Sequence, residues 1–392
     1  MLTTLEPTEV EQAKATKPLQ MAGAAALLLS CLVLLSAVLY RNAADRDFIS
    51  YWSSAKLLLA HANPYAGQAV LAMENRAGSG YREPLLMRNP PWALFVVAPL
   101  GLLSVRVAAF LWLATLIVLA LLAIKCLRLG TSPPPLVVFL FAPILGCAMA
   151  GQMSILLLAG IAFFFKYHQQ RPWLSGLALL MPAMKPHLFL LLWPVILIEC
   201  VRRRNWKLLV AFGAGLAAAA AFPLLFDPHI WTDYLAGIRA EHIEGQYLAN
   251  VSFLLRWMAP GHPVWVQSVP SVLGLALGAR YYWRRRRIWN WRVDGSALLL
   301  VSAIVSPYSW PFDQLLMIPA IQHVCSVRPG RRWAPWLAVV NAVAVLLLLL
   351  TVPLSSPAYA WSATACLIWY VWARHQAGLS GVRDEQVLAV AR

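Results

Sequence analysis

Charged residues are scarce in this chain of 392 residues: they make up 12% of it, whereas soluble domains carry about 25%. Hydrophobic residues supply 60% of the sequence and fall in long runs. A soluble protein of this length would need far more charge to cover its surface. The shortage of charge therefore excludes an ordinary soluble enzyme and a disordered chain, and it predicts an all-α, polytopic integral membrane protein.

The sequence also lacks the motifs with which soluble enzymes bind nucleotides or activate nucleophiles. It contains no Walker loop, Rossmann glycine pattern, H-E-x-x-H or G-x-S-x-G. Its six cysteines are scattered and none forms a C-x-x-C pair, which indicates small buried residues rather than a disulfide framework or a metal site. We therefore expect no cofactor and no metal-ligating residues, and leave a divalent-cation requirement open.

Apolar runs recur along the chain, from 21–40 to 358–373. A spanning helix needs about 20 residues. Several runs, among them 90–104 and 134–149, are shorter and could be thin spans, half-helices or re-entrant segments. We expect about 10–12 transmembrane helices. The predicted division has three parts: a cytoplasmic segment 1–19, a transmembrane domain 20–373 and a cytoplasmic tail 374–392.

Positive charge is in excess, with 32 Lys and Arg against 16 Asp and Glu. Arginines cluster at the ends of apolar runs, at 202–204, 284–287 and 328–332. This pattern is typical of cytoplasmic loops beside anionic lipids, and no basic surface with interleaved aromatics predicts nucleic-acid binding. With these clusters inside, the polar-rich loops 41–88 and 227–262 lie outside the membrane.

Two arrangements of the spans remain open. If twelve runs all span, Lys125, Arg128, Lys166 and Arg171 fall outside, against the positive-inside rule. If 90–104 is re-entrant and 173–199 breaks at its Lys-Pro pair, the same residues move inside.

An acidic residue opens the helix expected in the first outer loop. Apolar residues at helical spacing over 48–59 predict an amphipathic helix that lies on the outer membrane interface and ends at 63–65. Asp47 stands directly before it, and Asp45 would lie on a different helix face. Asp47 could serve as a general base or as the helix N-cap, and the sequence leaves both open.

Lys185 lies inside a long apolar run, between Pro182 and Pro186. A lysine at membrane depth is costly, and prolines break the helix around it. Lys185 could bind a phosphate, or it could mark a helix end and snorkel to the interface. His187 on its own indicates a buried, hydrogen-bonded histidine.

Three further polar features interrupt apolar surroundings. Gly151-Gln152 separates two apolar runs, where the amide could bind a ligand or satisfy a turn. Asn250-Val251-Ser252 precedes Arg256 and also fits the N-glycosylation pattern. The proline-broken segment 306–313 carries aromatics that indicate an interface belt, although tryptophan also suits sugar stacking.

Taken in order, these features resemble glycosyltransferase family 87, whose best-known members are polyprenyl-phosphate-mannose-dependent α-mannosyltransferases. Six signatures between 47 and 313 carry the resemblance: Asp47 with its helix to Asn63-Pro64-Tyr65, Tyr81 with Pro90-Pro91 and Pro99-Leu100, Gly151-Gln152, Lys185-Pro186, Asn250 with Ser252 and Arg256, and Ser306 to Trp310. The chain departs from the family pattern at His187 and at Phe312-Asp313, where the family often has histidine.

The resemblance implies a GT-C fold in the plasma (inner) membrane with its active site at the outer face. It implies inverting transfer of a sugar, with mannose expected, from a polyprenyl-phosphate donor to a hydroxyl of a glycolipid or glycan. The implied site residues are Asp47 as catalytic base; Lys185, His187 and Arg256 at the donor phosphate; and Tyr51, Asn63, Tyr65, Tyr81, Gln152, Asn250 and Trp310 at the substrates.

Three other classes of membrane protein compete with this interpretation. A transporter or flippase would show two related halves, which the sequence does not. A polysaccharide polymerase or ligase would share the outer site but use an undecaprenyl-diphosphate donor. A non-catalytic scaffold would need none of the polar residues that interrupt the apolar runs.

Overall fold

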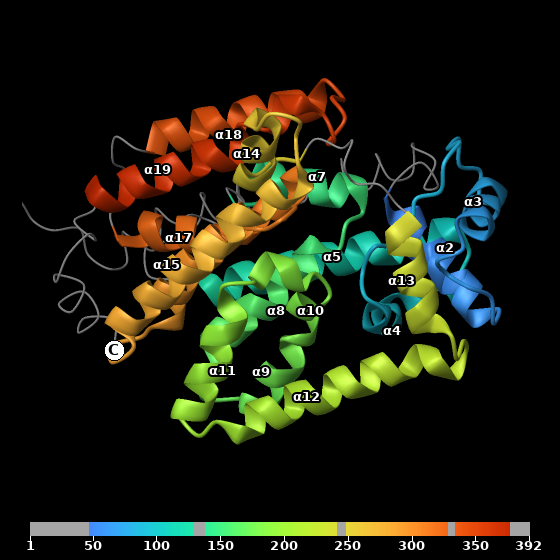
Figure 1. Cartoon of the computed structure of the whole chain (residues 1–392), viewed down its shortest axis with the longest axis horizontal. Helices are drawn as coiled ribbons and strands as arrows, with labels where there is room; N and C mark the ends of the chain where they lie inside the picture. Colours follow the sequence, from blue (N-terminus) through green and yellow to red (C-terminus); the bar gives the residue numbers. More distant parts are fainter. Residues whose placement is uncertain (1–46, 129–137, 241–247, 328–333, 377–392) are drawn as a thin grey trace, which may run out of the picture.

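The computed structural model describes residues 47–128, 138–240, 248–327 and 334–376. Within these ranges the chain is helical and has no strand, which confirms the all-α prediction. The expected first span at 21–40, the segment 1–19 and most of the tail lie outside the described residues. Helices from distant parts of the sequence pack side by side around α5 and α8 (Figure 1).

Three helices form the centre of the molecule: α5 (Val105–Leu127), α7 (Ala142–Ala150) and α8 (Ser154–Tyr167). Gly151 ends α7 with φ of +71°, a left-handed conformation that glycine adopts without strain. A Cβ on Gly151 would lie 2.6 Å from the Cβ of Phe48. Glycine is therefore required here twice, for the turn and for the contact with the helix that follows Asp47.

That helix is α2 (Phe48–Leu59), and α3 (Gly67–Arg76) follows it. The predicted extent of α2 is confirmed, but the prediction of an amphipathic helix with one exposed polar face is wrong, because ten of its twelve residues are buried. A Cβ on Gly101 would lie 2.7 Å from the carbonyl carbon of Ala55. The glycine thus lets the backbone of η2 (Ala98–Leu102) lie directly against α2.

The apolar run 90–104 does not form one long helix. It folds as η1 (Pro91–Ala93), α4 (Leu94–Val97) and η2, and α4 and η2 both contact α2. Prolines at the start of η1 and inside η2 explain the interruptions, because proline cannot donate the backbone hydrogen bond of a continuing helix.

The run 173–199 is also broken, at the Lys185-Pro186 pair. Its pieces are α9 (Pro172–Ala178), α10 (Leu180–Ala183), η3 (Pro186–Phe189) and α11 (Leu192–Arg202). The interruptions in 90–104 and 173–199 are those required by the arrangement in which 90–104 is re-entrant and 173–199 breaks at its Lys-Pro pair.

The cationic loops gather at one end of the bundle. The side-chain amide of Asn205 donates to the carbonyl of His168 at 3.0 Å, and Arg203 Nη2 donates to the carbonyl of Trp289 at 3.4 Å. Lys166 also lies within electrostatic reach of Cys126. The loops that carry Lys125, Lys166 and Arg171 therefore share an end with the 202–204 and 284–287 clusters, which removes the conflict with the positive-inside rule.

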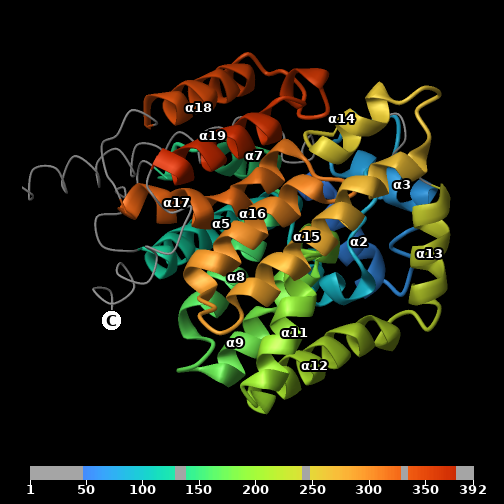
Figure 2. The ribbon, with the colours of Figure 1, turned by 60° about the vertical axis from the view of Figure 1, so that its left-hand side comes forward.

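The remaining helices complete the bundle. They are α12 (Trp206–Ala221), η4 (Phe222–Leu225), α13 (Ile230–Ala240), α14 (Val251–Met258), η6 (Val264–Ser268), α15 (Val269–Arg285), η7 (Trp291–Gly295), α16 (Ser296–Val305), η8 (Pro311–Met317), α17 (Ile318–Val327), α18 (Ala334–Leu349), η9 (Pro357–Tyr359) and α19 (Ser362–Gln376). In both views α13 lies beside α2 and α3, and α17, α18 and α19 lie together (Figures 1 and 2). The two polar-rich loops predicted from the sequence thus contain helices.

Two of the described helical stretches are long and apolar enough to cross a membrane, Val105–Leu127 and Trp206–Leu225. The expected 10–12 spans are not established by this count. Large apolar side chains are nevertheless exposed on the outer helices, for example Leu277 on α15, Leu346 on α18 and Val210 on α12. Surfaces of this kind are unfavourable in water and are typical of contact with lipid or protein.

Candidate active site

Asp47 precedes α2 but does not cap it. The residue occupies the N-cap position, yet its side chain makes no capping hydrogen bond. Asp47 Oδ2 instead accepts a hydrogen bond from Gln152 Nε2 at 3.0 Å. The side chain therefore does not act as a helix cap. It points the carboxylate at the turn between α7 and α8.

The amide of Gln152 joins Asp47 to two further groups. Its Oε1 accepts from the Tyr51 hydroxyl at 2.6 Å and from Lys185 Nζ at 3.5 Å. With two donors on one side and a carboxylate on the other, only one orientation of the amide satisfies all three partners. Gln152 thus links the acidic and basic residues that the sequence singles out.

The surroundings of Asp47 favour a carboxyl group that can hold a proton. Burial raises its pKa above the ordinary value, although the Gln152 hydrogen bond and the positive charges of Lys185 and Arg88 oppose the rise. Burial also raises the pKa of Tyr51 well above its ordinary value, and the Asp47 charge adds to this effect. Tyr51 therefore remains a neutral donor, while Asp47 is suited to proton exchange.

Lys185 forms a buried ion pair that the sequence did not predict. Its Nζ lies 2.8 Å from Asp313 Oδ1 and donates to Ser154 Oγ at 3.1 Å. Ser154 Oγ in turn donates to Asp313 Oδ1 at 2.5 Å. The side chains of Lys185 and Asp313 are 10% and 1% exposed. The lysine is thus held in the protein interior and does not snorkel to the surface.

The local fold fixes Asp313. The backbone N–H of Trp310 donates to Asp313 Oδ2 at 3.0 Å, and Pro311 opens η8 between them. The ammonium of Lys185 lies 4.9 Å from the centre of the Phe312 ring, a distance typical of a cation–π contact. Phe312 and Asp313, which stand where the family pattern often has histidine, therefore both contact Lys185.

His187 follows Lys185 by two residues. Its ring stacks on that of Tyr308, with ring centres 3.8 Å apart. Its Nε2 is buried and has no hydrogen-bond partner among the described residues, so the expectation of a hydrogen-bonded histidine is not met at this atom. Tyr308 lies within electrostatic reach of Arg88 and Asp313. His187 and Tyr308 thus form an aromatic wall beside the charged network.

Asn63 and Tyr65 make contacts within and between the two polar-rich loops. Asn63 Oδ1 accepts from the Tyr65 backbone N–H at 2.8 Å in the turn after α2. The Tyr65 ring meets Tyr234 of α13 edge-on at 5.3 Å, and its hydroxyl lies 3.5 Å from the Asn89 carbonyl. Tyr81 packs, partly buried, against the main core. The contacts of Tyr65 bring the two polar-rich loops together.

Asn250 and Arg256 carry structural contacts. Asn250 Oδ1 caps α14 by accepting from the Phe253 N–H at 2.8 Å, and its amide donates to the Ser306 carbonyl at 3.1 Å. Arg256 donates to the His262 carbonyl at 3.1 Å and to Gln267 Oε1 at 3.0 Å. Both groups hold α14 and the turn that follows it. Trp310 adjoins the network through its backbone and stacks on Phe312.

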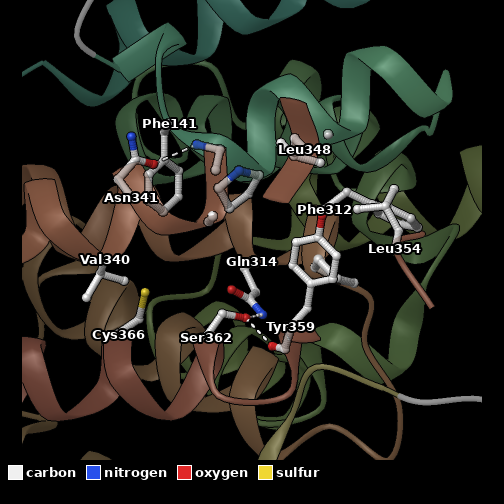
Figure 3. A pocket seen from close by; sticks show the side chains of 15 residues that line it. Phe141, Phe312, Gln314, Val340, Asn341, Leu348, Leu354, Tyr359, Ser362 and Cys366 are labelled. Carbon is white, nitrogen blue, oxygen red and sulfur yellow. Dashed lines mark hydrogen bonds between the residues drawn. The ribbon is translucent and has the colours of Figure 1, made fainter. Parts of the chain in front are cut away.

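A small apolar pocket lies behind η8, between α7, α18 and α19 (Figure 3). At its edge Gln314 Nε2 donates to Ser362 Oγ at 2.7 Å. The pocket has an open volume of about 30 Å³, which is enough for one or two water molecules. This pocket therefore does not hold a sugar. Among the described residues there is also no cluster of three or more His, Cys, Asp and Glu that could bind a metal ion.

Sequence reasoning missed three members of the site: Ser154, Asp313 and Arg88. Asp313 had a usable signal, because a lysine buried in an apolar run needs an acidic partner and Asp313 stands within a proline-broken apolar stretch of its own. Ser154 had no signal beyond its nearness to Gln152. Arg88 lies in a polar loop, and only the fold brings it within reach of Asp47.

Comparison of the chain with models of known protein families identifies a match. The family model of glycosyltransferase family 87 matches residues 88–307. The matched range includes Gln152, Ser154 and Lys185, while Asp47 and Asp313 lie outside it. No curated protein and no solved structure matches the chain.

Proposed function

Because the chain belongs to glycosyltransferase family 87, we propose that it transfers a sugar, mannose in the first instance, from a polyprenyl-phosphate donor to a hydroxyl of a glycolipid or glycan. The observation that carries this proposal is the network in which Gln152 joins Asp47 to Lys185. It supplies one carboxylate and one cation in a single site, as direct inverting transfer requires.

The donor chemistry accounts for the lack of nucleotide-binding motifs. When the bond between the anomeric carbon and the phosphate oxygen breaks, the electron pair leaves with the phosphate. A phosphate can depart without a proton, but its developing charge needs nearby positive charge. Lys185 and Arg88, which both act on Asp47 through their charges, are the candidates for this role.

The acceptor needs a base. Its hydroxyl oxygen forms the new bond to the anomeric carbon, and its proton passes to the carboxylate of Asp47. A single carboxylate is enough, because the sugar moves directly from donor to acceptor and no glycosyl-enzyme intermediate forms. Asp47 suits this step, since burial raises the pKa of its carboxyl group.

Asp313 sets the condition under which Lys185 can bind phosphate. The ion pair between them is buried, so a bound phosphate must share the ammonium with Asp313 or displace it. Ser154 contacts both partners and can hold Asp313 while the lysine turns. We therefore assign Lys185 a donor role that Asp313 restrains.

The distribution of charge supports a site at the outer membrane face. Lys125, Lys166, Arg171 and the two described arginine clusters lie at the end of the bundle away from Ser154, and such clusters are typical of the cytoplasmic side. The network of Asp47 then faces outward. The exposed apolar side chains of the outer helices would contact the lipid of the plasma membrane.

A panel of labelled donors tests this function. Purified protein is mixed with cell lipid extract and with mannose linked to polyprenyl monophosphate, to polyprenyl diphosphate or to a nucleotide. We expect transfer only from the monophosphate, with inversion at the anomeric carbon. Transfer from the diphosphate alone would indicate a polymerase or ligase, and movement of an intact lipid without transfer would indicate a flippase.

A further inference from the structure

A large hollow lies at the end of the bundle opposite Asp47. It has an open volume of about 530 Å³ and lies between the last turns of α8 and α11, the first turn of α12 and η7. Helix α8 separates the two sites, because it begins at Ser154 in the network and ends beside His168 in this cleft. Fourteen helical residues place them about 21 Å apart.

The cleft has a surplus of positive charge. Arg203 and Arg204 line it, whereas His168, which also lines it, is neutral because burial lowers its pKa to about 4. The single acidic residue of the lining, Glu199, is buried, and its oxygens already accept from Arg202, from Arg203 at 2.6 Å and from Tyr282 at 2.8 Å. Glu199 is therefore occupied by guanidinium groups and does not neutralise Arg204.

Arg204 is held at the edge of the cleft by its backbone. Its φ is +54°, a left-handed conformation that residues other than glycine rarely adopt. Hydrogen bonds from the Arg204 N–H to the Val201 carbonyl and from the Asn205 N–H to the Cys200 carbonyl fix this turn. The Arg204 side chain is exposed and makes no hydrogen bond or ion pair with another described residue.

Apolar side chains lie inside the cleft and on the outer face of α12. Phe164, Leu208 and Trp291 line the inner side of the cleft, whereas Trp206 and Val210 are exposed on the face of α12 turned away from Leu208. That exposed face begins just after Arg204. Guanidinium groups above an apolar helix face match a molecule with a phosphate head and hydrocarbon tails, since arginine binds phosphate through paired hydrogen bonds. A soluble phosphate compound would make no use of the apolar face.

We propose that Arg204, at the edge of this cleft, binds the phosphate of an anionic phospholipid whose acyl chains lie along the exposed face of α12. The proposal rests on the membrane placement given under the proposed function. It concerns a site about 21 Å from the transfer chemistry, so it is tested by binding and not by activity.

Native mass spectrometry of the full chain in detergent tests the site, with phosphatidylglycerol, phosphatidylcholine and inorganic phosphate as probes. We expect wild-type protein to retain phosphatidylglycerol in preference to phosphatidylcholine. Arg204→Gln should weaken this binding about tenfold, in line with the loss of a charged hydrogen bond. Arg204→Gly, which keeps the left-handed turn without strain, should weaken it equally and excludes misfolding as the cause.

The matched control is Arg284→Gln, because Arg284 is an exposed arginine of the neighbouring cluster and does not line the cleft. It should leave phosphatidylglycerol binding unchanged. An equal loss in both arginine variants would mean that the lipid binds by diffuse charge alone and would overturn the proposal. So would the absence of any preference for phosphatidylglycerol, or binding of inorganic phosphate as tight as that of the lipid. A failure of sugar transfer would leave this result untouched.

Discussion

At the scale of single residues, the site depends on one amide. Gln152 could have been a turn residue or a ligand, and the structure shows it in a third role, as the link between Asp47, Tyr51 and Lys185. It follows Gly151, whose φ of +71° ends α7. The Gly-Gln pair therefore sets both the turn and the geometry of the charged groups.

We predict that Gln152 affects how the rate of sugar transfer depends on pH. A general base acts only when ionised, so transfer should rise with pH through the pKa of Asp47, at a higher pH than for an ordinary carboxyl group because burial raises that pKa. Gln152→Leu removes a hydrogen bond that opposes the rise. The acidic limb of kcat/KM should therefore move further toward neutral pH. An unmoved limb with a lower kcat would make Gln152 a purely structural residue.

Asp313 gives a second prediction at this scale. Asp313→Asn keeps an oxygen that can accept from Ser154 and Lys185 but removes the competing charge. If Lys185 binds the donor phosphate, the donor KM should fall several-fold, while the thermal stability of the purified protein falls because the buried lysine loses its ionic partner. Lower stability with an unchanged donor KM would restrict Lys185 to a structural role.

At the scale of elements, the sequence predicted the extent of α2 but not its burial. The reason lies in three serines on the face assumed to be polar. Ser50, Ser53 and Ser54 are buried, and each hydroxyl donates to a nearby backbone carbonyl. Because these hydroxyls are satisfied locally, α2 can be buried on almost every face, and an apolar-polar pattern alone cannot reveal this.

Other residues of the site also show what the sequence pattern can and cannot predict. The structure brings Asp47, Gln152 and Lys185 into contact, three residues that the family pattern had singled out, and their roles in catalysis stay predictions. The sequence pattern also assigned Asn250 to substrate binding and Arg256 to the donor phosphate, whereas their described contacts hold α14. The Asn250 contact with the Ser306 carbonyl joins segments 56 residues apart, which spacing along the chain does not encode. The other partners lie within 11 residues, but only the fold shows that Asn250 and Arg256 use their side chains on them.

The junction between α2 and α7 gives the prediction at this scale. Gly151→Ala would force a left-handed alanine, at a cost of roughly 1–2 kcal/mol, and would place its Cβ 2.6 Å from that of Phe48. We expect a lower melting temperature in detergent and a loss of transfer. Gly213→Ala on α12 is the matched control, since nothing lies within 4 Å of its added Cβ and alanine favours a helix. If both variants behave alike, the contact with Phe48 does not set the site.

At the scale of the whole molecule, the account depends on sidedness. The Asp47 network and the two described arginine clusters lie at opposite ends of α8 and α11. The short helical segments of 90–104 and 173–199 allow the loops with Lys125, Lys166 and Arg171 to share one end with these clusters. The hydropathy of these runs had left two arrangements open. The fold favours one of them because prolines break the runs at defined positions.

Labelling of single cysteines checks this sidedness in a background from which the native cysteines are removed. Glu83→Cys lies in the first polar-rich loop and Arg284→Cys in an arginine cluster, and both positions are exposed. A membrane-impermeant maleimide should react with residue 83 in intact cells and with residue 284 only after permeabilisation. Reaction at 284 in intact cells would place the active site on the wrong side.

The central claim, that Asp47 takes the acceptor proton in a lipid-dependent sugar transfer, is tested most directly by Asp47→Asn. Asparagine keeps an oxygen that can accept from Gln152, and the residue makes no side-chain helix cap to lose. Its transfer from labelled polyprenyl-phosphate mannose should fall by roughly 10²–10⁴-fold, with donor binding retained and Asp233→Asn unaffected. Transfer by Asp47→Asn within a few-fold of the wild-type rate would contradict the account.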